Sequence, residues 1–81
     1  MKIRLRLFAM YREKVGRSEF EMSVAAGTTV GGVLVQLMVD YPSIAGLAGA
    51  TMFAVDQEFA VADTVLQDGQ ELALLPPVSG G

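Results

Sequence analysis

The residues best suited to chemistry in this sequence form its last segment. Two prolines are followed by Val78, Ser79 and a pair of glycines. Proline fixes φ and favours an extended backbone, whereas glycine lets the backbone pass where a Cβ would collide. The pattern predicts a thin rod that carries a bare carboxylate, on Gly81, into a narrow pocket of another protein. The segment expected to insert comprises Pro76, Pro77, Val78, Ser79 and Gly80.

The carboxylate of Gly81 could react in a way that buried side chains cannot. It can attack the α-phosphate of ATP, and a sulfur or nitrogen nucleophile can then capture the resulting acyl-adenylate. The alternative is an unreactive tail, although two terminal glycines arise by chance in only about 0.5% of sequences. The two prolines before them, and the scarcity of reactive groups elsewhere, favour a C-terminal carboxylate that takes part in a reaction.

The composition excludes most other chemistry. The chain has neither cysteine nor histidine, so it offers no thiolate nucleophile, no Ser-His-Asp relay and no Cys/His metal site. The clustered acidic residues do not match the spacing of a calcium loop; they are Asp56, Glu58, Asp63, Asp68 and Glu71. We therefore expect no metal, no bound cofactor and no catalysis by side chains of this chain alone.

Charge and hydropathy limit the partners. A net charge of −3 argues against nucleic acid, which requires a concentrated positive field. Residues 2–7 alternate basic and apolar side chains and so contain no signal-peptide core. The longest weakly polar stretch, residues 44–55, is shorter than the ~20 residues that span a bilayer. We expect a cytoplasmic protein without a membrane partner, and the 52% hydrophobic content suggests an apolar surface that a partner covers.

The first quarter of the chain predicts two strands joined by a short helix. Residues 2–8 and 18–24 alternate apolar and charged side chains, as strands with one buried face do. Residues 9–15 contain helix formers and end at Gly16, a candidate left-handed cap. Antiparallel pairing would set the acidic face of the second strand beside the basic face of the first, which consists of Lys2, Arg4 and Arg6.

The clearest element is an amphipathic helix near residues 30–41. Its cap is Thr28 or Thr29, and Pro42 ends it. A glycine pair at 31–32 weakens its first turn and is expected to let it approach the sheet closely. The apolar stripe has helical spacing; its members are Val30, Val33, Leu34, Leu37, Met38 and Tyr41.

The rest of the chain predicts short strands. Residues 51–55 and 58–61 flank a turn at 56–57, and the Asp-Gly pair at 68–69 begins a last strand at 71–75.

The predicted order of elements indicates an α+β fold. After a loose segment at residues 43–50, the short strands complete a mixed, partly parallel sheet with one main helix packed across it. Eighty-one residues suffice for one core. We expect a single domain at residues 1–75 and an extended, flexible tail at 76–81.

Two motifs resemble a known family. The ending PPVSGG follows the run DGQELA at residues 68–73, and residues 7–16 fit an FA-x-x-RE-x-x-G pattern. Together with the chain length, the Thr-Val helix start at 29–30 and the Ala-Val pair at 54–55, they resemble the small subunit of molybdopterin synthase over nearly the whole chain. The resemblance implies a β-grasp (ubiquitin-like) roll.

The resemblance also implies a reaction cycle. An ATP-dependent activating enzyme adenylates Gly81, and a persulfide sulfur donor converts it to a thiocarboxylate. The loaded tail enters the large synthase subunit, in a heterotetramer of two copies of each chain, and gives its sulfur to a cyclic pyranopterin precursor of molybdopterin. The catalytic side chains are then expected in the large subunit.

For the partner surface, the resemblance implicates Phe8, Phe59 and Leu75, which match an apolar contact patch of the family. The alternative for each is an ordinary core position, and it is favoured for Phe8. Arg12 matches the arginine of the RE motif and could pair with an acidic group of a partner, or it could be a solvated helix charge.

Three other functions remain open. A sulfur carrier of the thiazole pathway shares the glycine pair but usually lacks the prolines before it. A ubiquitin-like modifier would join Gly81 to a lysine of a target protein. A binding domain with an unreactive tail is the third alternative.

Overall fold

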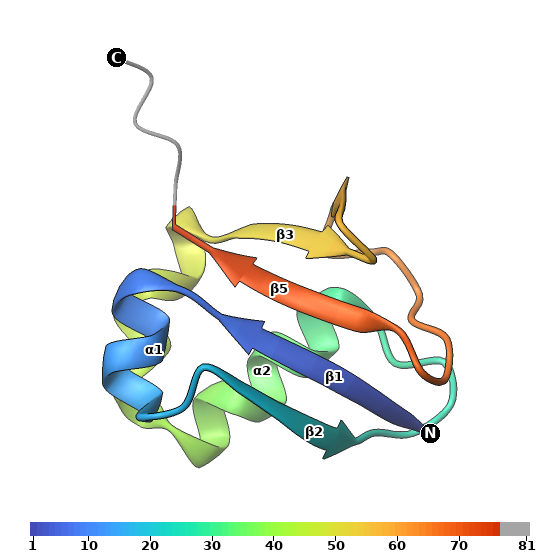
Figure 1. Ribbon diagram of the computed structural model, residues 1–81, viewed down its shortest axis with the longest axis horizontal. Helices are drawn as coiled ribbons and strands as arrows, with labels where there is room; N and C mark the ends of the chain where they lie inside the picture. The colour runs from blue at the N-terminus through green and yellow to red at the C-terminus, as the bar shows by residue number, and fades with distance from the viewer. Residues whose placement is uncertain (77–81) are drawn as a thin grey trace.

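The computed structural model describes residues 1–76. Its sheet is covered on one face by the helix α2 (Val30–Asp40), while the helix α1 (Ala9–Val15) lies at the end of the sheet where the last strand ends (Figure 1). The elements in chain order are β1 (Lys2–Leu7), α1 (Ala9–Val15), β2 (Glu19–Ser23), α2 (Val30–Asp40), the 3₁₀ helix η1 (Pro42–Ala50), β3 (Met52–Val55), β4 (Glu58–Ala60) and β5 (Glu71–Leu75).

The five strands form one mixed sheet in the order β2-β1-β5-β3-β4. β1 and β5 are parallel, and the other three pairs are antiparallel. The last strand in the sequence therefore lies at the centre of the sheet, between β1 and β3 (Figure 1). The prediction of an α+β roll with a partly parallel sheet and one main helix is confirmed, and the fold is a β-grasp.

The core lies between the sheet and α2. β1 and β5 turn alternate side chains toward the helix, which presents the predicted apolar stripe. Tyr11, which carries a hydroxyl, is buried, but among the described residues no other polar or charged side chain is. The side chains with almost no exposure are those of Ile3, Leu5, Leu7, Val30, Val33, Leu37, Ile44, Leu66, Leu72 and Leu74.

The first turn of α2 is fixed by a cap and by a contact with a loop. Thr29 Oγ1 accepts a hydrogen bond from the backbone N–H of Gly32, at 3.1 Å, which confirms Thr29 as the cap. The Gly31 N–H donates to the carbonyl oxygen of Ala62 at 2.9 Å, and a Cβ on Gly31 would lie 3.2 Å from the Ala62 Cβ. Gly31 thus admits the loop after β4, whereas a Cβ on Gly32 would meet only Thr28 and Thr29. The prediction that the glycine pair brings the helix close to the sheet is wrong.

A second prediction is wrong at residues 43–50. This segment is the 3₁₀ helix η1, not a loose connection. Ile44 is fully buried, and Thr51 Oγ1 donates to the carbonyl oxygen of Leu47 at 2.9 Å. Glycine and alanine give this segment no periodic pattern. It is held in place by the buried side chain of Ile44 and by contacts with the rest of the fold.

The predicted turns are confirmed. Asp56 and Gln57 have φ values of 49° and 71°, as a tight type I′ hairpin requires. Gly69 has φ 85°, which glycine adopts without steric cost. Its N–H donates to the carbonyl oxygen of Lys2 at 2.7 Å, while the Asp68 carboxylate accepts from the Lys2 N–H at 2.7 Å. This turn therefore joins the start of β5 to the start of β1.

Candidate functional site

The sheet face opposite α2, called here the open face, has a charged half and an apolar half. The register places Arg4 beside Glu21 on β2 and beside Glu71 on β5. Two residues further along β1, Arg6 is paired with Ala73, and Ala73 is paired with Ala54. The face therefore changes from charged to apolar toward the end of β5.

The apolar half is a patch beside the origin of the tail, formed by Phe8, Phe59, Leu75, Ala54 and Ala73. These residues line a hollow of about 230 Å³, and Arg6, Gln57 and Glu71 complete its lining. Phe59 is 74% exposed, whereas Ala54 and Ala73 are each only 8% exposed because the larger side chains surround them. The structure thus brings together Phe8, Phe59 and Leu75, the three residues that the family resemblance had implicated.

The core alternative is wrong for Phe8 and Phe59. Phe8 is half-buried on the open face, where the Arg6 guanidinium carbon lies 5.3 Å from its ring centroid, and Phe59 is largely exposed. Leu75 is also half-buried. The patch residues Ala54 and Ala73 were missed because their place depends on the β3–β5 register.

Arg12 does not line the apolar patch. It lies in α1 and is exposed, and within residues 1–76 no carboxylate forms an ion pair with it. Its pairing with a partner stays a prediction.

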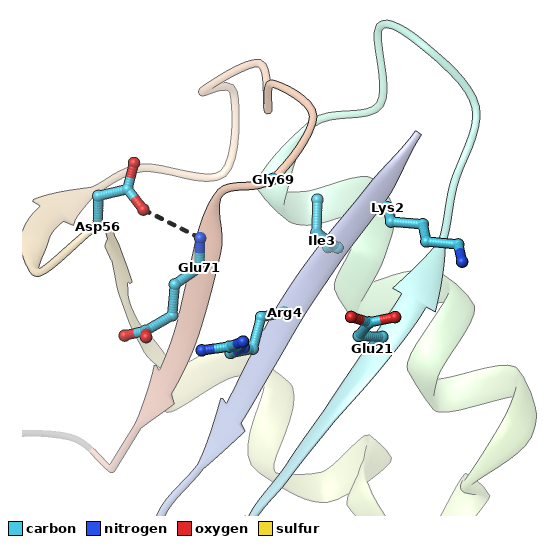
Figure 2. Close-up of a pocket in the computed structure, with 7 residues that line it drawn as sticks. All are labelled: Lys2, Ile3, Arg4, Glu21, Asp56, Gly69 and Glu71. Atoms are coloured by element: carbon cyan, nitrogen blue, oxygen red, sulfur yellow. Dashed lines mark hydrogen bonds between the residues drawn. The ribbon is translucent and has the colours of Figure 1, made fainter.

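The charged half contains basic and acidic groups side by side (Figure 2). Arg4 Nε lies 3.3 Å from a carboxylate oxygen of Glu19, and Arg6 Nη1 lies 3.5 Å from one of Glu71. The predicted cross-strand pairing of the basic face is confirmed. Such exposed pairs contribute at most ~1 kcal/mol each.

Asp56 fastens the β3–β4 turn to β5. One of its carboxylate oxygens accepts from the backbone N–H of Glu71 at 3.0 Å (Figure 2), and the other accepts from Gln70 Nε2 at 3.2 Å. Within residues 1–76, no group of acidic residues has the arrangement of a metal site. No helix in this part of the chain is long and apolar enough to cross a membrane.

The tail begins at the centre of the sheet. β5 ends at Leu75, and exposed Pro76 leads away from the same end of the sheet that carries α1 (Figure 1). Five predicted site residues lie outside the described residues: Pro77, Val78, Ser79, Gly80 and Gly81. The structure therefore gives the origin of the tail at Pro76.

The model of the ThiS family matches residues 5–81. The chain belongs to the ThiS family. Three full-length relatives are similar to it. Molybdopterin synthase sulfur carrier subunits from Arabidopsis thaliana and Mycobacterium tuberculosis are 30% and 35% identical, each over 100% of this chain and over 84% and 99% of their own lengths. Small archaeal modifier protein 3 of Haloferax volcanii is 33% identical over 100% of both chains.

Solved structures share the fold. The solution structure of the Haloferax volcanii HVO 2177 protein has a TM-score of 0.88 at 33% identity, covering 100% of this chain and 87% of that one. The crystal structure of SAMP1 from the same organism has a TM-score of 0.85 at 28% identity and covers both chains completely. A complex of subunits 1 and 2 of molybdopterin-converting factor from Helicobacter pylori has a TM-score of 0.69 at 22% identity over 100% of both chains, which shows likeness of fold alone.

Proposed function

We propose that this chain is the sulfur carrier and small subunit of molybdopterin synthase. The observation that carries the proposal is the set of full-length relatives with that function in their names, at 30–35% identity. Their matches include the residues that form the tail, since they span 100% of this chain. The absence of cysteine and histidine fits a chain that carries a reacting group without side-chain catalysis.

In the proposed cycle, the Gly81 carboxylate attacks the α-phosphate of ATP on an activating enzyme, and pyrophosphate leaves. A persulfide sulfur then attacks the acyl carbon, and AMP leaves; cleavage of the remaining sulfur–sulfur bond by a reducing thiol releases the thiocarboxylate. The thiocarboxylate sulfur bonds to a carbon of a cyclic pyranopterin precursor as a carbon–oxygen bond of that carbon breaks. Water then cleaves the acyl carbon–sulfur bond, which leaves the sulfur on the pterin and restores the Gly81 carboxylate.

The protein that receives the loaded tail is the large subunit of the synthase, which supplies the catalytic side chains. Docking on the apolar patch brings it to the origin of the tail, because Leu75 belongs to the patch and is followed directly by Pro76. We place the assembly, two copies of each chain, in the cytoplasm.

The test is intact-mass analysis of the protein purified from its native host. The expected result is a fraction heavier by the exchange of one oxygen for sulfur at the C-terminus, together with the large subunit in the same preparation. Absence of that fraction in cells that are actively making the cofactor, with the activating enzyme present, would refute sulfur carriage.

A second function, protein modification, is supported by the similarity to small archaeal modifier protein 3. A modifier would leave peptides of this chain's C-terminus joined to lysine side chains of other proteins. Such branched peptides in a digest of host proteins, without the sulfur-bearing form, would replace the carrier function with the modifier function.

A further inference from the structure

A second apolar hollow lies at the origin of the tail, formed by α1, η1 and Pro76. We call it the root hollow. Its volume is about 130 Å³, and its lining includes Met10, Tyr11, Gly46, Leu47, Ala50 and Pro76. No charged side chain lines it, and Met10 is 47% exposed at its edge. The hollow shares no lining residue with the apolar patch.

Hydrogen bonds hold the walls of the root hollow in place. Thr51 Oγ1 donates its one proton to the carbonyl oxygen of Leu47 at 2.9 Å. In the hydrogen bond between Thr51 and Tyr11, the Tyr11 hydroxyl is therefore the donor and Thr51 Oγ1 the acceptor. Tyr11 is only 2% exposed. This chain of bonds joins α1 to η1 and satisfies the polar atoms of both side chains. An apolar surface of fixed shape is left.

The hollow and the patch flank the tail at consecutive residues. Leu75 lines the patch and Pro76 lines the hollow, and successive side chains of an extended chain point to opposite sides. A protein that takes in residues 77–81 must close around this point. It therefore meets the root hollow as well as the patch.

We propose that the root hollow receives one apolar side chain of the large synthase subunit, of the size of leucine, methionine or phenylalanine. A cavity of about 150 Å³ lined by aliphatic and aromatic side chains holds a benzene molecule, so a hollow of about 130 Å³ accommodates a single side chain and excludes a helix or strand. The proposal rests on the proposed function and adds a second contact to it.

The tail of this chain is a poorer occupant. Val78 follows Pro76 by two residues, a span of roughly 7 Å at most, so it is near enough to reach the hollow. However, a residue that precedes a proline is pushed toward extended backbone, and Pro76 precedes Pro77. The sharp reversal needed to bring Val78 back against Pro76 is therefore disfavoured.

The two glycines of η1 provide a matched test. A Cβ on Gly46 or on Gly49 would meet no atom within 4 Å, and neither residue has positive φ. Only Gly46 lines the hollow. Gly46→Leu should therefore fill the hollow while Gly49→Leu leaves it open, with both variants folding as the parent does.

The experiment measures binding of the full-length variants to the purified large subunit from the same host by calorimetry. We expect Gly46→Leu to raise Kd by about tenfold or more, which corresponds to about 1.4 kcal/mol, and Gly49→Leu to change it less than about twofold. Thermal unfolding of both variants should match that of the parent.

Equal Kd values for the two variants would overturn the proposal. So would loss of adenylation by the activating enzyme while binding to the large subunit is unchanged, since the hollow would then serve that enzyme. In the isolated chain, a shift of the Met10 methyl NMR signal by Val78→Ala would assign the hollow to the tail. If the parent chain forms a dimer and Gly46→Leu dissociates that dimer, the root hollow would be assigned to a second copy of the chain.

Failure of the proposed function would be recognised separately. It would appear in the parent protein as absence of the sulfur-bearing mass and of binding to the large subunit. If the large subunit does not bind in the root hollow, only the comparison between the Gly46 and Gly49 variants would show it.

Discussion

A substitution of Phe59 can separate the contribution of the open face to partner binding from its contribution to folding. The side chain of Phe59 is 74% exposed in the apolar patch. Complete burial of a phenylalanine is worth about 1.5–3 kcal/mol, so covering the exposed three-quarters would contribute about 1–2 kcal/mol to binding. Phe59→Thr, which preserves β-propensity, should therefore raise Kd for the large subunit roughly 5- to 30-fold.

The same substitution should have a small effect on folding. Only about a quarter of the side chain is already buried, so the free energy of unfolding should fall by less than about 1 kcal/mol. Calorimetric titration with the large subunit and urea denaturation of the isolated chain measure the two quantities.

Val39→Thr is the matched control, because Val39 is also 74% exposed but lies on α2. Valine and threonine have similar helix propensities, so neither binding nor folding should change appreciably. The reasoning would be refuted if Phe59→Thr left Kd unaltered, or if Val39→Thr weakened binding equally.

Three further predictions concern the apolar patch, the C-terminal glycines and the β3–β4 turn. Leu75→Glu should weaken binding to the large subunit more than it lowers the free energy of unfolding, because Leu75 is half-buried at the edge of the patch; equal losses would make it a core residue. Deletion of Gly80–Gly81 should abolish sulfur transfer, measured by product formation, with the unfolding temperature nearly unchanged; a large fall would mean that the tail packs on the domain. Gln57→Gly should raise the free energy of unfolding by up to ~1 kcal/mol in urea titrations, because Gln57 has φ 71° in a turn that favours glycine; a clear loss of stability would show that the Gln57 side chain contributes contacts there.

Local patterns in the sequence predicted most of the fold. The alternation at residues 2–8 and 18–24 assigned the faces of β1 and β2, and the helical stripe beginning at Val30 assigned the buried side of α2. In each case, the side that a residue faces depends on its own position within one element.

The features that the sequence did not predict depend on contacts between distant segments. η1 has no periodic pattern, and the fit of Gly31 against Ala62 joins residues that no local pattern relates. The root hollow requires α1, η1 and Pro76 to meet. Phe8, Phe59 and Leu75 were suggested by resemblance, whereas the placement of Ala54 and Ala73 between them required the β3–β5 register.

In the proposed carrier, the central place of β5 fixes the point from which the tail delivers its reactive group. Strand pairing holds Leu74 between Leu7 of β1 and Phe53 of β3, and it holds Leu75 against Met52 of β3, so the origin of the tail is fixed relative to the patch. Six residues, 76–81, span roughly 20 Å at most when fully extended. The pocket that accepts Gly81 must therefore lie within that distance of the partner's docking surface. In the proposed carrier, docking thus limits where the sulfur can be delivered, and the large subunit needs only to place the pterin within that range.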